Sequence, residues 1–147
     1  MLALRAILHP TDFSAHSRPA LELACALARD HGGRLVLLHV HPPEIVYGEM
    51  APIIEEPAAV RAALKEELDL WRPTDRSVPT DCVLKEGNPA TTIVETAKEL
   101  HADLIVMGTH GRSGVGRLLL GSVAEVVLRK APCPVLTVKV PLTKVMA

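Results

Sequence analysis

The chain reads LIVMGTHGRSGVGRLLLGS over residues 104–122, where an apolar run leads straight into a segment rich in glycine. The run Leu104–Met107 is too short for an ordinary helix and has the length of a strand buried in a parallel sheet. Four glycines then fall within the nine positions 108–116. Glycine permits positive φ angles and lets a ligand approach the backbone amides closely. The stretch therefore predicts a buried strand that ends in a ligand-binding loop.

A second glycine feature, Gly121-Ser122, stands where a helix over about residues 122–130 is expected to begin. The free N–H groups and the positive dipole end of such a helix favour a phosphate group. Together with the glycine loop they would form a polyphosphate cradle, to which Arg112 and Arg117 could add charge-assisted contacts. Glycine motifs are weak evidence by themselves, so a purely structural glycine-rich connection stays open at this point.

Two better-known phosphate motifs fit this sequence poorly. The spacing from Gly111 to Gly116 is that of a P-loop, but Arg117-Leu118 stands in place of the Lys-Ser/Thr pair that holds phosphate and magnesium. A dinucleotide-binding fingerprint would follow the first strand, and its G-x-G-x-x-G spacing is absent there. Both motifs are rejected.

Outward from this stretch, apolar runs and helical stripes alternate along the chain. Strands are expected over residues 3–9, 34–40, 78–84, 104–107 and 134–138. Helices are expected from about Pro19 to the Gly32-Gly33 stop, over 57–70, from Pro89 behind an Asn88 cap to about Leu100, and over about 122–130. The alternation predicts an α/β fold: a five-stranded parallel sheet with helices on both faces, in Rossmann-like or flavodoxin-like layering. Such sheets bind ligands at the carboxyl ends of their strands, near the point where the strand order reverses.

Size and composition fit a single domain. We expect it to span residues 1–147, with a core over about 4–139 and a tail over 140–147. With a net charge of -1 and 2% aromatic residues, the chain lacks the basic surface and stacking rings that nucleic acids require. No apolar run has the length of a membrane span. Cys25, Cys82 and Cys133 form no C-x-x-C pair, which indicates reduced thiols and a cytoplasmic location.

The glycine pattern resembles a known signature. Gly108, two residues, Gly111, nine residues and then Gly121-Ser122 match the G-2x-G-9x-G-(S/T) signature of the ATP-binding branch of the universal stress protein family. The opening strand with its Asp-bearing turn at 7–14, and the stretches 87–90, 102–114 and 131–136, are also similar to blocks of that family. The similarity runs from about residue 4 to residue 139, and only residues 41–76 lack diagnostic features.

The resemblance implies an adenine nucleotide, ATP or else ADP or AMP, bound together with Mg²⁺. In this family the aspartate after the first strand lies near the ribose and phosphates, which implies that role for Asp12 and a possible contact with Mg²⁺. A purely turn-forming aspartate is the alternative. The other implied contacts are Pro10 and Thr11 in the same turn, Val40 at the adenine, Met107 and Gly108 at the ribose, His110 in the glycine loop, and Gly111, Arg112, Gly121, Ser122 and Val123 at the phosphates.

The resemblance and the residues together rank the possible functions. A nucleotide-dependent regulatory module of the stress response fits best, with hydrolysis slow or absent. The alternative is a slow Mg-dependent ATPase or nucleotidyl-transfer enzyme, although no general base or P-loop lysine is evident. A flavodoxin-like redox domain is disfavoured because its phosphate loop would follow the first strand, and a phosphoacceptor receiver because its acidic cluster is missing. Related proteins dimerise through the last strand, so a homodimer through residues 135–138 is expected, with an unknown downstream protein partner.

Two histidine positions stand out. His9 stands where the family more often has an apolar residue, so it either disturbs the packing below the adenine or is a satisfied buried histidine. His39 and His41 face the same side of a strand and could chelate a metal, but no third ligand is evident.

Overall fold

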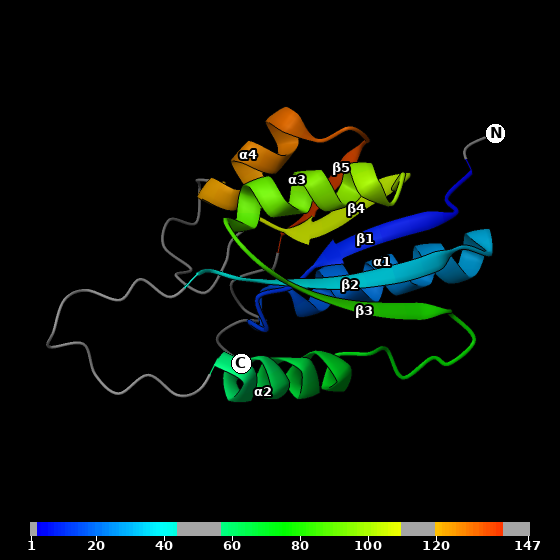
Figure 1. The fold of residues 1–147 in the computed structure, drawn as a ribbon. Coiled ribbons are helices and arrows are strands. Elements are labelled where there is room, and N and C mark those ends of the chain that lie inside the picture. The colour runs from blue at the N-terminus through cyan, green and yellow to red at the C-terminus, as the bar shows by residue number, and fades with distance from the viewer. Residues whose placement is uncertain (1–2, 44–56, 110–119, 140–147) are drawn as a thin grey trace, which may run out of the picture.

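Strands and helices alternate along the chain (Figure 1), and the structure, a computed structural model, describes residues 3–43, 57–109 and 120–139. The strands are β1 (Ala6–Pro10), β2 (Arg34–His41), β3 (Thr80–Glu86), β4 (Leu104–Gly108) and β5 (Val135–Val138). The helices are α1 (Arg18–His31), α2 (Pro57–Leu70), α3 (Pro89–Glu99) and α4 (Ser122–Lys130). Each predicted element is present.

Three strands begin later than predicted: β5 by one residue, at Val135, and β1 and β3 by more, each for a local reason. β1 starts at Ala6 and not at Ala3, because the amides of Arg5 and Ala6 donate to the Asp103 carboxylate at 2.9 and 3.0 Å. β3 starts at Thr80 and not at Val78, because the intervening Pro79 has no N–H to give to a strand ladder.

The sheet is parallel throughout, in the order β3-β2-β1-β4-β5. This confirms the predicted fold class and places β5 at an edge, as expected. From β1 the chain builds outward through β2 and β3, and it then crosses to the other side of β1 to form β4 and β5. The strand order therefore reverses between β1 and β4, and a ligand crevice is expected at their carboxyl ends.

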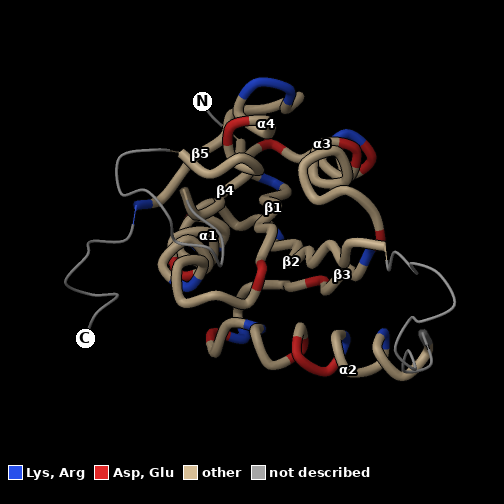
Figure 2. Tube along the Cα trace, turned by 90° about the vertical axis from the view of Figure 1, so that its left-hand side faces the viewer, with Lys and Arg blue, Asp and Glu red and all other residues tan. Residues whose placement is uncertain are grey.

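Helices cover both faces of the sheet (Figure 2), with α1 and α2 on one side and α3 and α4 on the other. β2 has six consecutive buried residues, because each face of this inner strand meets a helical layer. The side chains alternate between two hydrophobic clusters: Ile7, Leu35, Leu37 and Val106 face α1, while Leu8, Val36, Leu38 and Ile105 face α3 and α4. Within the described ranges, no helix is long and apolar enough to cross a membrane.

The helix ends follow the sequence signals. Gly32 ends α1 in the left-handed region at φ 65°, and a Cβ on Gly33 would overlap the carbonyl oxygen of Leu4. Asn88 caps α3 as predicted, because its side chain accepts a hydrogen bond from the Thr91 amide at 3.1 Å. Gly32 thus marks where α1 returns the chain to β2, and Asn88 marks where the chain leaves β3 for α3.

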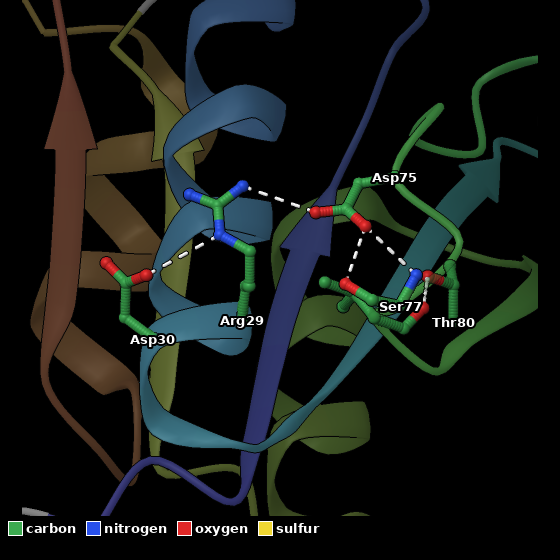
Figure 3. Close-up of polar contacts among 6 residues, drawn as sticks. Arg29, Asp30, Asp75, Ser77 and Thr80 are labelled. Atoms are coloured by element: carbon green, nitrogen blue, oxygen red, sulfur yellow. Dashed lines mark hydrogen bonds and ion pairs between the residues drawn. The ribbon is translucent and has the colours of Figure 1, made fainter.

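A network of polar contacts holds the C-terminal end of α1, near the amino ends of the strands (Figure 3). Arg29 bonds Asp75 at 3.3 Å, and Asp75 also accepts hydrogen bonds from the amide and hydroxyl of Ser77, at 2.9 and 2.6 Å. The Ser77 hydrogen bonds, with the Arg29 contact, hold the pKa of Asp75 below its usual value. The network fastens the segment between α2 and β3 to α1, at the end of the sheet away from the carboxyl ends of the strands.

Candidate ligand-binding site

A cavity of about 570 Å³ opens at the carboxyl ends of β1, β2 and β4, where the strand order reverses. It brings together nine of the twelve residues predicted to contact a ligand: Pro10, Thr11, Asp12, Val40, Met107, Gly108, Gly121, Ser122 and Val123. The remaining three, His110, Gly111 and Arg112, lie outside the described residues. Residues far apart in the sequence therefore meet in one place.

The loop after β1 is held to β2 and folded on itself. The Thr11 amide donates to the carbonyl of Leu38 at 2.8 Å, which continues the β1–β2 ladder by one step. The Thr11 hydroxyl accepts a hydrogen bond from the Phe13 amide and lies 3.0 Å from the Ser17 hydroxyl. Asp12 accepts a hydrogen bond from the Ser14 amide at 2.9 Å. Asp12 thus has the turn-forming role that its sequence context allowed, and its side chain also lines the cavity.

Apolar side chains from several elements form much of the cavity wall. Leu38 and Val40 come from β2, Met107 from β4, Ile93 from α3 and Leu64 from α2. The first four belong to the hydrophobic cluster on the α3 and α4 side of the sheet. Such a wall suits a flat apolar group, while the polar atoms gather at the loop after β1 and at α4.

The N-terminus of α4 has no side-chain cap. Gly121 is the N-cap residue, with φ -61° and ψ 152°, and its own amide donates to the Thr109 carbonyl at 2.7 Å. The amides of the first turn, beginning at Ser122, have no partner inside a helix. Ser122 and Val123, which line the cavity, are thus better placed than Gly121 to offer an amide to an anion.

The comparisons with known proteins agree with this geometry. The model of the universal stress protein family matches residues 3–139. The chain belongs to the universal stress protein family. A universal stress protein of Thermus aquaticus is 40% identical over 137 residues, which is 92% of this chain and 98% of that protein.

Two solved structures of the family share the fold. Universal stress protein UspA from Lactobacillus plantarum has a TM-score of 0.74 at 25% identity, covering 92% of this chain and 98% of that chain. A universal stress protein solved in complex with cAMP has a TM-score of 0.70 at 26% identity, covering 95% of this chain and 99% of that one. At least one protein of similar fold and sequence therefore binds an adenine nucleotide.

His9 is buried next to the site and takes no part in lining it. Its side chain is 0% exposed, and Nδ1 donates to the Val106 carbonyl at 2.8 Å. His9 is thus buried within the sheet with one ring nitrogen hydrogen-bonded, which only partly matches the satisfied histidine that the sequence allowed. In the described part of the chain, its Nε2 has no hydrogen-bond partner.

Several cavity residues were not predicted from the sequence as ligand contacts. Ser17 was not singled out, and His39 was considered only as half of a possible metal site. His39 instead donates through Nδ1 to the Thr11 carbonyl at 2.8 Å, and its ring stands 4.3 Å from that of Phe13. The position of His39 at the carboxyl end of β2 was the available signal. Leu64 gave none, because the placement of α2 depends on tertiary packing.

A metal cluster of protein ligands is not found in the described ranges. No three His, Cys, Asp or Glu side chains gather there in a way that could hold a metal ion. A divalent ion at this site would have to share its coordination with a ligand, and Asp12 is the only carboxylate among the described cavity residues.

Proposed function

We propose that this universal stress protein binds ATP in the cavity described above and acts as a nucleotide-dependent regulatory module. The observation that carries the proposal is the convergence of nine predicted contact residues on one cavity at the reversal of strand order. The relative solved with cAMP supports an adenine nucleotide as the ligand class. ADP or AMP would occupy the same site.

The cavity suggests an orientation for the nucleotide. The base would lie against the apolar wall near Val40, and the ribose beside Met107 and Gly108. The phosphates would face the first turn of α4 at Ser122, where free amides and the helix dipole favour negative charge. Asp12 would lie near the ribose and phosphates, and its carboxylate is a suitable ligand for the Mg²⁺ that accompanies the nucleotide.

A slow ATPase is the second candidate. Asp12 is the only carboxylate among the described residues of the cavity, and that set contains no Lys or Arg. Efficient phosphoryl transfer needs a group that orients water and a cation that stabilises charge. The rate of inorganic phosphate release from Mg-ATP distinguishes the candidates. A regulatory module would leave the bound ATP intact far longer than an enzyme would.

We further propose a homodimer through β5 and a cytoplasmic location. β5 is an edge strand with Leu136 exposed, and an unpaired edge favours pairing with a second copy. All three cysteines are free thiols, which suits a reducing compartment. The downstream protein partner would read the occupied state of the nucleotide site.

Thermal denaturation with added nucleotide tests the proposed function. A ligand that binds only the native state raises the melting temperature, so ATP with Mg²⁺ should produce a concentration-dependent increase. If ATP, ADP and AMP all leave the melting temperature unchanged, the proposal is wrong. A shift with FMN alone would favour a flavodoxin-like function instead.

Gly121→Val tests where the phosphates bind. The backbone of Gly121 has φ -61°, which any residue adopts, so the variant should fold. Its branched side chain would occupy the space beside the first turn of α4, and ATP affinity should fall at least tenfold in a calorimetric titration. Ser122→Ala is the milder comparison. Ser122 is the first residue of α4 and not its cap, so the loss of its hydroxyl should weaken binding by about 1 kcal/mol without lowering stability. Unchanged ATP affinity in folded Gly121→Val would place the phosphates elsewhere.

A further inference from the structure

His39 occupies an unusual position for a histidine. It lies near the end of β2, the residue is 9% exposed, and it forms part of the cavity wall. Its Nδ1 is 2.8 Å from the carbonyl oxygen of Thr11. Because a carbonyl oxygen only accepts, Nδ1 must carry the hydrogen and donate it. A buried side chain of β2 therefore contacts the backbone of the loop after β1.

The hydrogen bond from His39 falls on a specific peptide. The Thr11 carbonyl belongs to the peptide that joins Thr11 to Asp12, so the bond restrains the backbone from which the Asp12 side chain leaves. On its other side, Thr11 donates its amide to the Leu38 carbonyl at 2.8 Å. β2 thus holds both backbone groups of Thr11, one through its main chain and one through the His39 imidazole.

The ring of His39 also supports the residue that follows Asp12. Phe13 has φ 64°, a left-handed conformation that a bulky side chain rarely adopts. Its ring lies 4.3 Å from that of His39 and 6.1 Å from that of Trp71. Such a conformation persists only where the surrounding structure enforces it. The His39 ring provides part of that support, so Asp12 is flanked on both sides by residues that contact His39.

We infer that His39 is a positioning residue of the nucleotide site, which fixes the loop after β1 so that the Asp12 carboxylate faces the phosphates and Mg²⁺. The inference rests on the proposed function, and it adds a residue that acts through Asp12 and not by its own contact with the phosphates. It assigns two separate roles to the imidazole: the Nδ1–H donor orients the Thr11–Asp12 peptide, and the ring supports Phe13.

A pair of variants separates the role of the Nδ1–H donor from that of the ring. His39→Asn retains a donor near the position of Nδ1 but removes the ring, and His39→Phe retains a ring but removes the donor. Calorimetric titration of the full chain with Mg-ATP should show about tenfold weaker binding for His39→Phe, the size expected from one lost hydrogen bond. His39→Asn should stay within about threefold of the unmodified protein, since the donor is the part that orients Asp12.

A double-mutant cycle tests whether His39 acts through Asp12. Asp12→Asn should weaken Mg-ATP binding, and adding His39→Phe should weaken it no further if the two residues act as one unit. A residue that merely supports the fold would instead lower the melting temperature of each variant and multiply the two losses. Multiplied losses would therefore overturn the inference.

Other outcomes are equally decisive. Wild-type affinity in folded His39→Phe overturns the positioning role and leaves the proposed function intact. If His39→Phe does not fold, His39→Asn carries the test, and an affinity as low as that of Asp12→Asn overturns the role of the donor. Failure of the unmodified protein to bind any adenine nucleotide overturns the proposed function, and this inference with it.

Discussion

His9 lies in the central strand of the sheet with no solvent around it. Burial lowers the pKa of its imidazole from 6.5 to about 4, and the hydrogen bond to Val106 and the charge of Asp12 oppose this only in part. The folded protein therefore holds His9 neutral. In the unfolded chain the same histidine takes up a proton near pH 6.5.

The sign of the resulting pH dependence follows directly. Because the folded pKa is depressed, the folded state binds fewer protons than the unfolded chain, and stability decreases as the pH falls from about 6.5 towards 4. Between pH 7 and pH 5 this histidine should remove about 2 kcal/mol from the free energy of unfolding. His9→Leu should abolish that part of the decrease, as measured by urea denaturation at both pH values.

A matched control isolates the buried histidine. His101 is exposed and has φ 50°, a conformation that asparagine tolerates, so His101→Asn should keep the pH dependence of the unmodified protein. An unchanged difference between pH 7 and pH 5 in His9→Leu would show that His9 is protonated in the folded state as readily as in the unfolded chain.

Single residues also mark the limit of what the sequence predicts about the site. Gly121 and Ser122 were predicted as phosphate contacts from the spacing of the glycine signature, and both line the cavity. The role of His39 was not predicted, because it depends on the path of the loop after β1. That path includes Phe13 at a positive φ, and no turn motif in the sequence indicates a left-handed phenylalanine.

At the scale of elements, β5 presents a free edge with a defined polarity. The amide of Ile105 in β4 donates to the carbonyl of Pro134 at 3.0 Å. The amide of Thr109, just after β4, donates to the carbonyl of Val138 at 3.2 Å. In a strand the backbone N–H and C=O groups of successive residues point to opposite sides. The backbone groups of the even-numbered residues of β5 therefore point towards β4. The N–H groups of Val135 and Thr137 therefore point outward, towards a possible second copy.

Proline substitutions along β5 test the dimer on this basis. Thr137→Pro removes an outward N–H and leaves the β4–β5 ladder intact, so it should yield a folded monomer in sedimentation. Leu136→Pro is the control, because it removes a donor to β4 and should destabilise the protomer itself. A monomeric unmodified protein at high concentration, or a dimeric Thr137→Pro variant, would exclude pairing through β5.

Helix boundaries were predictable from caps, prolines and apolar spacing, but the start of β3 was missed although Pro79 stands directly before it. α2 and α4 have the predicted ends, and α3 begins behind its Asn88 cap. The start of β1 was not predictable, because it depends on Asp103, which is 97 residues from Ala6 along the chain. Local signals fix most helix ends, whereas a strand end such as that of β1 depends on a partner that only the folded chain brings close.

At the scale of the whole molecule, the two ends of the parallel strands form different surfaces, called here the amino edge and the carboxyl edge of the sheet. The amino edge is closed by local polar contacts, such as the network of Arg29, Asp75 and Ser77. The carboxyl edge is open and lined by both helical layers, with Leu64 of α2 on one side and Ile93 of α3 on the other. The alternation of strands and helices predicted this layering, but the sequence did not predict the strand order that places the cavity.

A bound nucleotide should therefore stabilise the molecule unevenly. Hydrogen exchange of backbone amides reports local opening, and a ligand slows exchange most where it contacts the protein or restrains a nearby loop. With Mg-ATP, protection should increase in the loop after β1, at the end of β2 and in the first turn of α4. The amides around Asp75 and Ser77, at the opposite edge, serve as the internal control and should change little. Equal protection at both edges would indicate that the nucleotide stabilises the fold as a whole, and protection confined to the amino edge would place the ligand outside the cavity.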